Sequence, residues 1–322
     1  MRNEFFGKPE DVRGLMSTII RSLWRASDAA YPEASWRANV QRIKLLIAGL
    51  HHWQPVQDVI TAEKGTPLNR LCNERPETLG LLVWPYLNAS WAAKTRLSKI
   101  IEHSRVITSL GLPVDFSVDQ HVELATLDDI YQDGYLMLDQ PLWFMREGLL
   151  TINLMVKELR AFSISFSFSY DDNGNPCAII GGIQGRNTDD ILSVYRTLTK
   201  SLYGMRPRDF LLETLKIMLR AFNIHRLFAV TDAARHHRHS YFNGSTNGLV
   251  PDYNKIWDDR GGAQLNADFF ELDLSPQRRD FASIKPNKRS LYRKRFQYLD
   301  LLETRIKDGL ENSCPVETRN FD

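Results

Sequence analysis

The stretch FSISFSFSYDDNGNPCAIIGGI, residues 162–183, predicts two adjacent antiparallel strands. From Phe162 to Tyr170, large apolar side chains alternate with four serines, which is the period of a β-strand. The following DDNGNP contains an Asn-Gly pair, which favours a hairpin turn because both central residues of such a turn need positive φ. CAIIGGI is continuously apolar, as expected of a return strand buried on both faces.

The segments after this hairpin alternate between helix and strand signals. Helical periodicity is expected over 189–204 and 206–223, a short strand over 225–232, a further strand within 261–274, and a closing basic helix. Before the hairpin, 114–127, 134–144 and the residues from 149 onward have strand-like patterns. Strands and helices in this order indicate an α+β fold with a mixed, largely antiparallel sheet rather than a regular βαβ alternation.

Residues 10–110 are predicted to be mainly helical. The segments 12–27 and 40–53 repeat apolar residues at spacings of three and four, whereas 64–78 is a passage rich in proline and polar residues. A third helix is expected within 84–111, with Asn88 or Ser90 as its N-cap and Gly111 as its end. We therefore divide the chain into a helical region 1–112, an α+β domain 113–280, and a basic C-terminal helix and tail 281–322.

The composition excludes several classes of protein. Hydrophobic residues make up 43% of the 322 residues, and 41 Lys and Arg nearly balance 39 Asp and Glu, so a nucleic-acid partner is not expected. Cys72, Cys177 and Cys314 form no CxxC pair, which indicates neither a disulfide framework nor a zinc site. The absence of a secretory signal or a long apolar stretch predicts a cytoplasmic protein, with peripheral contact with the inner membrane as an alternative.

The glycine-rich segment 181–188 lies between an expected strand and an expected helix. Free backbone N–H groups at such a junction bind anions, and Arg186 adds a cation. One interpretation is a cofactor loop that holds phosphates. The other is a tight turn that uses glycine for lack of space, since the segment matches neither GxGxxG nor a P-loop. The cofactor-binding candidates are Gly182, Gln184, Gly185, Arg186 and Asn187.

The loop TDAARHHRHSYF, residues 231–242, follows a predicted strand. His236 is a candidate for proton transfer, and Arg238 is a candidate contact for an anion or a partner; a merely solvated loop is the alternative. Metal ligation is not expected, because neighbouring histidines on a loop point apart and no HExxH is present.

Two further segments carry candidate residues. In PDYNKIWDDRGG, 251–262, Tyr253 is a candidate general acid and Asp252 a candidate base, whereas an aromatic pair with an Asp cap is the structural alternative. The C-terminal KPNKRSLYRKRFQYLDLL is predicted to be a basic amphipathic helix that contacts an anionic membrane surface or an acidic partner, or is simply solvated. Its candidate contact residues are Lys288, Arg289, Arg293 and Lys294.

Several motifs together resemble the VirK/YbjX family of enterobacterial and related proteins. They are GGIQGRN at 181–187, YGMRPRDFLLETLKI at 203–217, YNKIW and RGG within 253–262, and NKRSLYRKRFQYLD at 287–300. The resemblance implies a link to virulence and to tolerance of cationic antimicrobial peptides, and it supplies no catalytic residue. Relatives tend to have His-x-x-Arg where this chain has RHHRH, so either Arg235 or, with a slip of one residue, His236 takes the histidine position.

The order of elements in the C-terminal half also resembles the N-acetyltransferase-like fold. That resemblance implies an acyl-CoA or acyl-carrier donor, with its phosphates on the loop from Gln184 to Thr188 and proton transfer to or from an amine near His236 and Tyr253. Two helices stand before the next strand where one is typical, and the usual glycine pattern is not matched.

Two hypotheses follow from the sequence. The first is an acyltransferase-like enzyme that acts on an amine, with acyl-CoA as its cofactor and an unknown acyl acceptor. The second is a non-catalytic binding factor that docks on an anionic membrane or a protein partner through its basic C-terminal helix.

Overall fold

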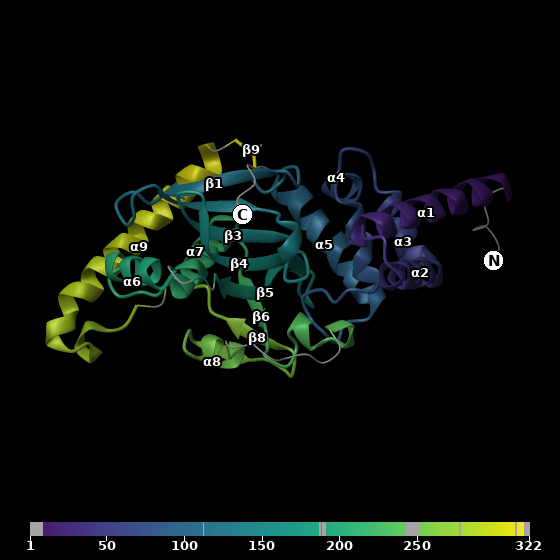
Figure 1. The fold of residues 1–322 in the computed structure, drawn as a ribbon. Helices are drawn as coiled ribbons and strands as arrows, with labels where there is room; N and C mark the ends of the chain where they lie inside the picture. The colour runs from purple at the N-terminus through teal and green to yellow at the C-terminus, as the bar shows by residue number, and fades with distance from the viewer. Residues whose placement is uncertain are drawn as a thin grey trace.

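A nine-stranded sheet forms the middle of the molecule, with helices on both sides (Figure 1). The computed structural model describes residues 9–111, 113–186, 188, 191–242, 252–276, 278–312 and 314–318, with side chains from residue 14 onward. The strand order is β7-β8-β6-β5-β4-β3-β2-β1-β9. The strands are β1 (Gln120–Thr126), β2 (Gly134–Asp139), β3 (Leu150–Val156), β4 (Leu159–Tyr170), β5 (Pro176–Gly185), β6 (Arg226–Val230), β7 (Gly262–Gln264), β8 (Phe269–Leu272) and β9 (Val316–Glu317).

The predicted hairpin is the pair β4–β5, and it lies at the centre of the sheet. Its antiparallel register runs from Tyr170 opposite Pro176 to Phe162 opposite Gly185. The expected turn geometry is wrong in one respect: Gly174 has positive φ (77°), whereas Asn173 is not among the positive-φ residues. The Asp171 carboxylate instead accepts the N–H groups of Asn173 and Asn175, at 3.0 and 2.9 Å, so an aspartate stabilises the turn.

The helices of the N-terminal part gather on one side of the sheet (Figure 1). Two predictions need correction. The passage 64–78 contains a helix that begins at Pro67 behind its cap Thr66, and the third predicted helix begins at Ala93 rather than after Asn88 or Ser90. The elements are α1 (Pro9–Ala30), α2 (Trp36–His51), α3 (Trp53–Ile60), α4 (Pro67–Glu74), the 3₁₀ helix η1 (Pro76–Leu82) and α5 (Ala93–Leu110).

The C-terminal helices pack mainly on the other side. The predicted helices are confirmed as α6 (Ile191–Ser201), α7 (Pro207–Ala221), α8 (Tyr253–Asp258) and α9 (Pro286–Asn312). Two short 3₁₀ helices, η2 (Leu142–Phe144) and η3 (His236–Arg238), lie in loops. The predicted strand within 261–274 is a hairpin of two strands, β7 and β8. None of the described helices is long and apolar enough to cross a membrane.

The four serines of β4 are buried, and two of them, Ser167 and Ser169, make polar contacts with the N-terminal part. The Tyr86 hydroxyl donates to Ser167 Oγ at 2.7 Å, and Ser169 Oγ donates to the carboxylate of Glu102 at 2.6 Å. His103 Nδ1 accepts the backbone N–H of Phe168 at 3.0 Å. Because buried polar groups are costly without partners, this set of bonds fixes where the helices lie on the sheet.

The glycines at the end of β5 are explained by lack of space. None of Gly181, Gly182 and Gly185 has positive φ. A Cβ at Gly181 would overlap the carbonyl oxygen of Glu147, and one at Gly182 would overlap the carboxylate of the same residue. At Gly185 it would overlap the Tyr195 hydroxyl. These residues lie inside β5, so the prediction of a tight turn is wrong, whereas the lack of space that it assumed is present at all three glycines.

Gly181→Ala should destabilise the protein by about 1–3 kcal/mol or more, because the new methyl group meets fixed main chain rather than a flexible side chain. The matched control is Gly14→Ala, since Gly14 lies in α1 and a Cβ added there would have nothing within 4 Å. That change should stabilise by up to about 1 kcal/mol. Urea unfolding of both variants measures the difference, and a Gly181→Ala protein as stable as the wild type would contradict the crowding argument.

Candidate functional site

The site lies where the one parallel strand pair among the described residues separates. β5 and β6 are paired only from Cys177 opposite Arg226 to Ile180 opposite Ala229. Beyond that point Tyr253 of α8 occupies the edge of β5: its hydroxyl accepts the N–H of Ile183 at 3.0 Å and lies 3.4 Å from the carbonyl oxygen of the same residue. α8 therefore fills the opening between the two strands.

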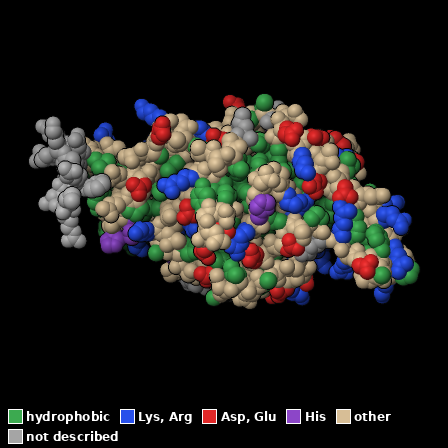
Figure 2. Space-filling view, turned by 180° about the vertical axis from the view of Figure 1, so that it is seen from behind, with side chains coloured by type: hydrophobic (Ala, Val, Ile, Leu, Met, Phe, Trp, Pro, Cys, Tyr) green, Lys and Arg blue, Asp and Glu red, His purple; other side chains and the backbone are tan. Residues whose placement is uncertain are grey.

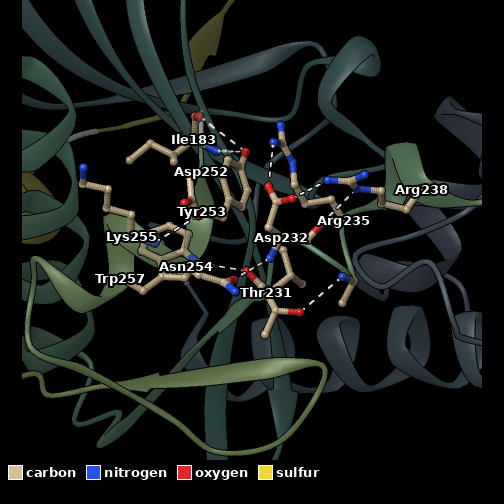
Figure 3. A network of polar contacts seen from close by, with 12 residues as sticks. Ile183, Thr231, Asp232, Arg235, Arg238, Asp252, Tyr253, Asn254, Lys255 and Trp257 are labelled. Carbon is tan, nitrogen blue, oxygen red and sulfur yellow. Dashed lines mark hydrogen bonds and ion pairs between the residues drawn. The ribbon is translucent and has the colours of Figure 1, made fainter. Parts of the chain in front are cut away.

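A polar network holds the loop after β6 against α8 (Figure 3). The Arg235 guanidinium stacks 3.9 Å from the centroid of the Tyr253 ring. Asp232 binds Arg235 at 3.4 Å and also pairs with Arg238. Asn254 Oδ1 accepts the backbone N–H of Asp232 at 2.8 Å. These contacts fix the start of the loop that carries the histidines.

A buried cluster of polar side chains lies next to this network. It consists of Glu147, between η2 and β3, and of His236 and His237 on η3. The His236 Nε2 atom is 3.9 Å from Glu147 Oε1. The Gln184 side-chain amide donates to Glu147 Oε2 at 3.4 Å. The Nδ1 atoms of both histidines are buried and have no hydrogen-bond partner among the described residues.

Burial dominates the titration of these groups. Loss of hydration raises the pKa of Glu147 to about 8, against a smaller opposite effect of the positive charge on Arg235. Burial, followed by the neighbouring His237 and arginine charges, lowers the pKa of His236 to about 2. Burial, with the charges of Arg235 and Arg146, lowers the pKa of His237 to about 4. At neutral pH the close approach of Glu147 and His236 is thus no ion pair, because both side chains are mostly uncharged.

Among these groups Glu147 is the one suited to proton transfer near pH 7. A general acid or base works best when its pKa is close to the working pH. His236 is too weak a base by this measure, and burial raises the pKa of Tyr253 well above its ordinary value. The roles in proton transfer that the sequence suggested for His236 and Tyr253 stay predictions. Of the three side chains, Glu147 has the pKa closest to neutral pH.

The same cluster could offer ligands to a metal ion. One potential ligand atom from each of Glu147, His236 and His237 lies within 4.8 Å of the others. The expectation that neighbouring histidines point apart is wrong here, because the two ring centroids are only 3.7 Å apart. The local charge nevertheless favours an anion over a cation, since Arg146 and Arg235 act on both histidines.

Aromatic rings enclose Arg146, the neighbour of Glu147. Its guanidinium lies 4.7 Å from the centroid of the Trp84 ring and 5.4 and 5.6 Å from those of Tyr241 and Phe242. Trp84 Nε1 in turn donates to the hydroxyl of Tyr31 at 2.7 Å. This cation–π enclosure joins the N-terminal helices to the histidine loop across the site.

The other predicted residues lie in different surroundings. Asp252 is exposed and its carboxylate caps α8 by accepting the N–H of Lys255 at 3.2 Å, as the alternative interpretation expected. Tyr253 and Trp257 form the expected aromatic pair, 5.5 Å apart. Tyr253 lies beside the site, where it contacts Ile183 and Arg235. Asp252 is not part of the cluster of Glu147, His236 and His237.

The five residues predicted to bind a cofactor do not form one site. Gly182 is buried against Glu147, whereas Gln184 is exposed and contacts Glu147 only through its side-chain amide. Gly185 packs against Tyr195. The backbone N–H of Arg186 points at the carbonyl oxygen of Ala161, 3.4 Å away, so it is not free for a phosphate. Asn187 lies outside the described residues.

The predicted basic contacts lie on two surfaces. Arg238 is tied to Asp232 in the network described above. Lys288, Arg289, Arg293 and Lys294 are exposed on the first half of α9. Lys and Arg side chains follow this projecting part of the molecule in Figure 2.

Glu147 and Arg146 were missed by the sequence analysis. No motif surrounds them, and their nearest sequence neighbours are apolar residues and a glycine. The available signal was indirect: the adjacent Gly181 and Gly182 mark a close approach, but the sequence does not say which segment approaches.

The protein is of the α+β class, with an open, mostly antiparallel sheet. Its polar site lies where the parallel strands β5 and β6 separate. No solved structure matches the protein. The chain belongs to the VirK/YbjX family: residues 34–308 match the family described as "Protein of unknown function (DUF535)".

The relatives include two uncharacterised proteins and one named for the membrane. The "Uncharacterized protein YbjX" of Escherichia coli is 23% identical over 74% of this chain and 74% of its own length. An uncharacterised protein of Haemophilus influenzae is 26% identical over 69% of this chain and 74% of its own. The "Membrane protein LapB" of Mannheimia haemolytica is 26% identical over 61% and 85% respectively.

The raised pKa of Glu147 predicts a specific pH dependence of stability. Between the ordinary glutamate pKa of 4.5 and about 8, the folded state holds a proton that the unfolded state has lost, so this contribution to stability falls as the pH rises. Glu147→Gln removes the titration, and its stability relative to wild type should increase by about 1.4 kcal/mol per pH unit across that window.

Denaturant unfolding at a series of pH values from 5 to 8, roughly the interval between the two pKa values, measures this difference. Glu63→Gln is the matched control, because Glu63 is exposed in the turn before α4. This change should have little effect on stability, because an exposed side chain is hydrated in both the folded and the unfolded state. Parallel curves for wild type and Glu147→Gln would mean that Glu147 is ionised in the folded protein.

Proposed function

We propose that this protein is an acyltransferase-like enzyme that transfers an acyl group to an amine. One observation carries the proposal: Glu147, a buried carboxyl with a pKa of about 8, lies where β5 and β6 separate. A carboxyl with this pKa exchanges protons with an amine near neutral pH. The nearby guanidinium groups of Arg146 and Arg235 favour negative charge that develops on an acyl oxygen.

The strand order supports an N-acetyltransferase-like interpretation of the fold. β5 is followed by α6 and α7, then by β6 in parallel beside it, and then by α8 and the β7–β8 hairpin, with β8 next to β6. This is the order expected of the resemblance described above, in which a hairpin leads to a strand, a helix start and a further strand. The second helix before β6 is a departure from that order.

In the proposed reaction the amine nitrogen attacks the carbonyl carbon of a thioester, and the bond from that carbon to sulfur breaks. Glu147 in its ionised form accepts the proton that the nitrogen loses. The thiolate leaving group takes up a proton, which Glu147 can return, so the enzyme ends in its initial state. Neutral His236 lies 3.9 Å from the same carboxyl and would accept a hydrogen bond from an amine held there.

The donor would be an acyl-CoA or an acyl carrier. In this proposal its phosphates lie near the end of β5, where Gln184 is exposed and Arg186 is partly exposed. Gly185→Asp is a poor probe of such binding, because a side chain there meets Tyr195 and the Phe162 ring whether or not a cofactor binds. Arg186→Gln changes the charge without that collision.

The test is a thermal-shift screen of the protein against acetyl-CoA, a long-chain acyl-CoA and free CoA, followed by an assay for thiol release with a primary amine. A ligand that binds only the folded state raises the melting temperature. We expect a shift that Arg186→Gln reduces, and thiol release that falls by about a hundredfold in Glu147→Gln, as for loss of a general base. Glu63→Gln should leave both unchanged. Absence of any shift and of thiol release would refute the acyl-donor proposal.

A second candidate is a non-catalytic binding factor that docks through α9 on an anionic membrane or an acidic partner. The supporting observation is the set of exposed cations on the projecting half of this helix, of which Lys288 and Lys294 have no ion pair among the described residues. Either activity could underlie a role in virulence or in tolerance of antimicrobial peptides, which the family resemblance suggests. The name of the Mannheimia relative, "Membrane protein LapB", agrees with a membrane-associated role.

Charge reversal separates the two candidates. Replacing Lys288, Arg289, Arg293 and Lys294 by Glu should abolish the cellular phenotype if α9 is the functional surface, whereas Glu147→Gln should then have no effect. The acyltransferase proposal predicts the opposite pattern. Tolerance of a cationic peptide, measured in cells whose own gene is replaced by each variant, gives the readout.

A further inference from the structure

The outer face of α2 is apolar although it faces solvent. Trp36, Ile43 and Ile47 have exposed fractions of 74%, 56% and 62%, and Leu50 is exposed to 46%. At about 100° per residue these four side chains fall within an arc of about 60°. Contiguous exposed apolar surface of this kind marks a site of interaction rather than an ordinary protein surface.

The opposite face of the same helix is already used for packing. Ala38, Leu45 and Gly49 are buried and lie about half a turn away from the exposed stripe. Gly49 is in close contact with the side chain of Leu23 on α1. The exposed stripe is therefore not the core-facing side of a displaced helix, and α2 presents apolar side chains on both sides.

Charge and aromatic residues around the stripe point to its occupant. The sequence of α2, WRANVQRIKLLIAGLH, contains no Asp or Glu. Arg37 and Lys44 are exposed beside the stripe, and no ion pair engages them among the described residues. Trp24 of α1 and Trp53 of α3 are also exposed, on two helices that contact α2. A helix in the plane of an anionic bilayer has this combination of an apolar face, flanking cations and interfacial tryptophans.

We propose that the outer face of α2 docks on an anionic lipid bilayer, with the helix parallel to the membrane plane. Ile43 and Ile47 enter the boundary between headgroups and acyl chains, and Arg37 and Lys44 contact the phosphates. This surface is at the opposite end of the molecule from the projecting part of α9 (Figure 1). It would bring the protein to a membrane whether or not the acyl-transfer proposal is correct.

The experiment is flotation of the full-length protein with two kinds of vesicle, one of phosphatidylcholine alone and one of equal parts phosphatidylcholine and phosphatidylglycerol. We expect binding to the anionic vesicles that weakens with salt. The double variant Ile43→Glu and Ile47→Glu should reduce the partition coefficient by about tenfold or more, since it loses apolar insertion and adds repulsion. Arg37→Gln with Lys44→Gln should keep some binding but lose most of its salt dependence.

The matched control is Arg196→Glu with Lys200→Glu, which makes the same change of charge on the exposed side of α6 and should leave the binding unchanged. Lys288→Glu with Lys294→Glu, the α9 variant, tests the competing surface. All four altered apolar and basic positions of α2 are exposed, and a thermal melt checks that each variant is folded. The proposal is overturned if wild type does not float with anionic vesicles, or if the α9 variant loses binding while the α2 variants keep it. It is also overturned if the wild type is a dimer that Ile43→Glu and Ile47→Glu convert to a monomer without any change in vesicle binding.

Discussion

The close approach of the Glu147 segment to β5 is the constraint on which the site depends. The main chain of Glu147 lies against Gly181 and its carboxylate against Gly182, with no room for a side chain at either glycine. This contact places a carboxyl group inside the protein, where lack of hydration controls its protonation. It also positions the neighbouring Arg146, which the N-terminal helices enclose. The conformation of one short loop thus determines the chemistry of the site.

The electrostatics of the site follow from burial more than from pairing. Glu147, His236 and His237 are close enough to interact, yet each is favoured in its uncharged form because charged forms are poorly solvated there. The nearby permanent charges belong to Arg146 and Arg235, whose guanidinium groups face aromatic rings. Under the acyl-transfer proposal, these neutral groups beside fixed positive charge would favour a reaction in which negative charge develops.

The central strand β4 makes apolar contacts on one face of the sheet and polar contacts on the other. Its large apolar side chains enter the main core together with α7, whereas Ser167 and Ser169 make polar contacts with Tyr86 and Glu102 of the N-terminal part. Such polar contacts specify the position of a helix better than apolar packing alone, because each donor must meet its acceptor. The boundary drawn near residue 112 therefore separates regions of different secondary structure that share an extensive contact.

Most of the local structure could be predicted from the sequence alone. Alternation in residues 162–170, the turn signal after them and the spacing of apolar residues in α7 all report on neighbours along the chain, so they predicted the hairpin, the helices and the α+β class. The caps show the limits of this approach, since α5 begins without the polar cap that Asn88 or Ser90 would have supplied. The sequence analysis named Gln184, His236 and Tyr253, which the structure places at or beside the cluster, but it did not name Glu147; the roles predicted for the three residues stay predictions.

The surroundings of the glycines and of the titrating groups depend on tertiary contacts, which the sequence does not show. A glycine pair looks the same in sequence whether it binds phosphate or admits a neighbouring segment, and the difference lies in Glu147, more than thirty residues away in the chain. The pKa of a carboxyl depends on its solvation, which local sequence does not encode. The solvent-facing apolar side of α2 was likewise hidden, because helical periodicity shows that a helix is apolar but not which of its faces the rest of the protein covers.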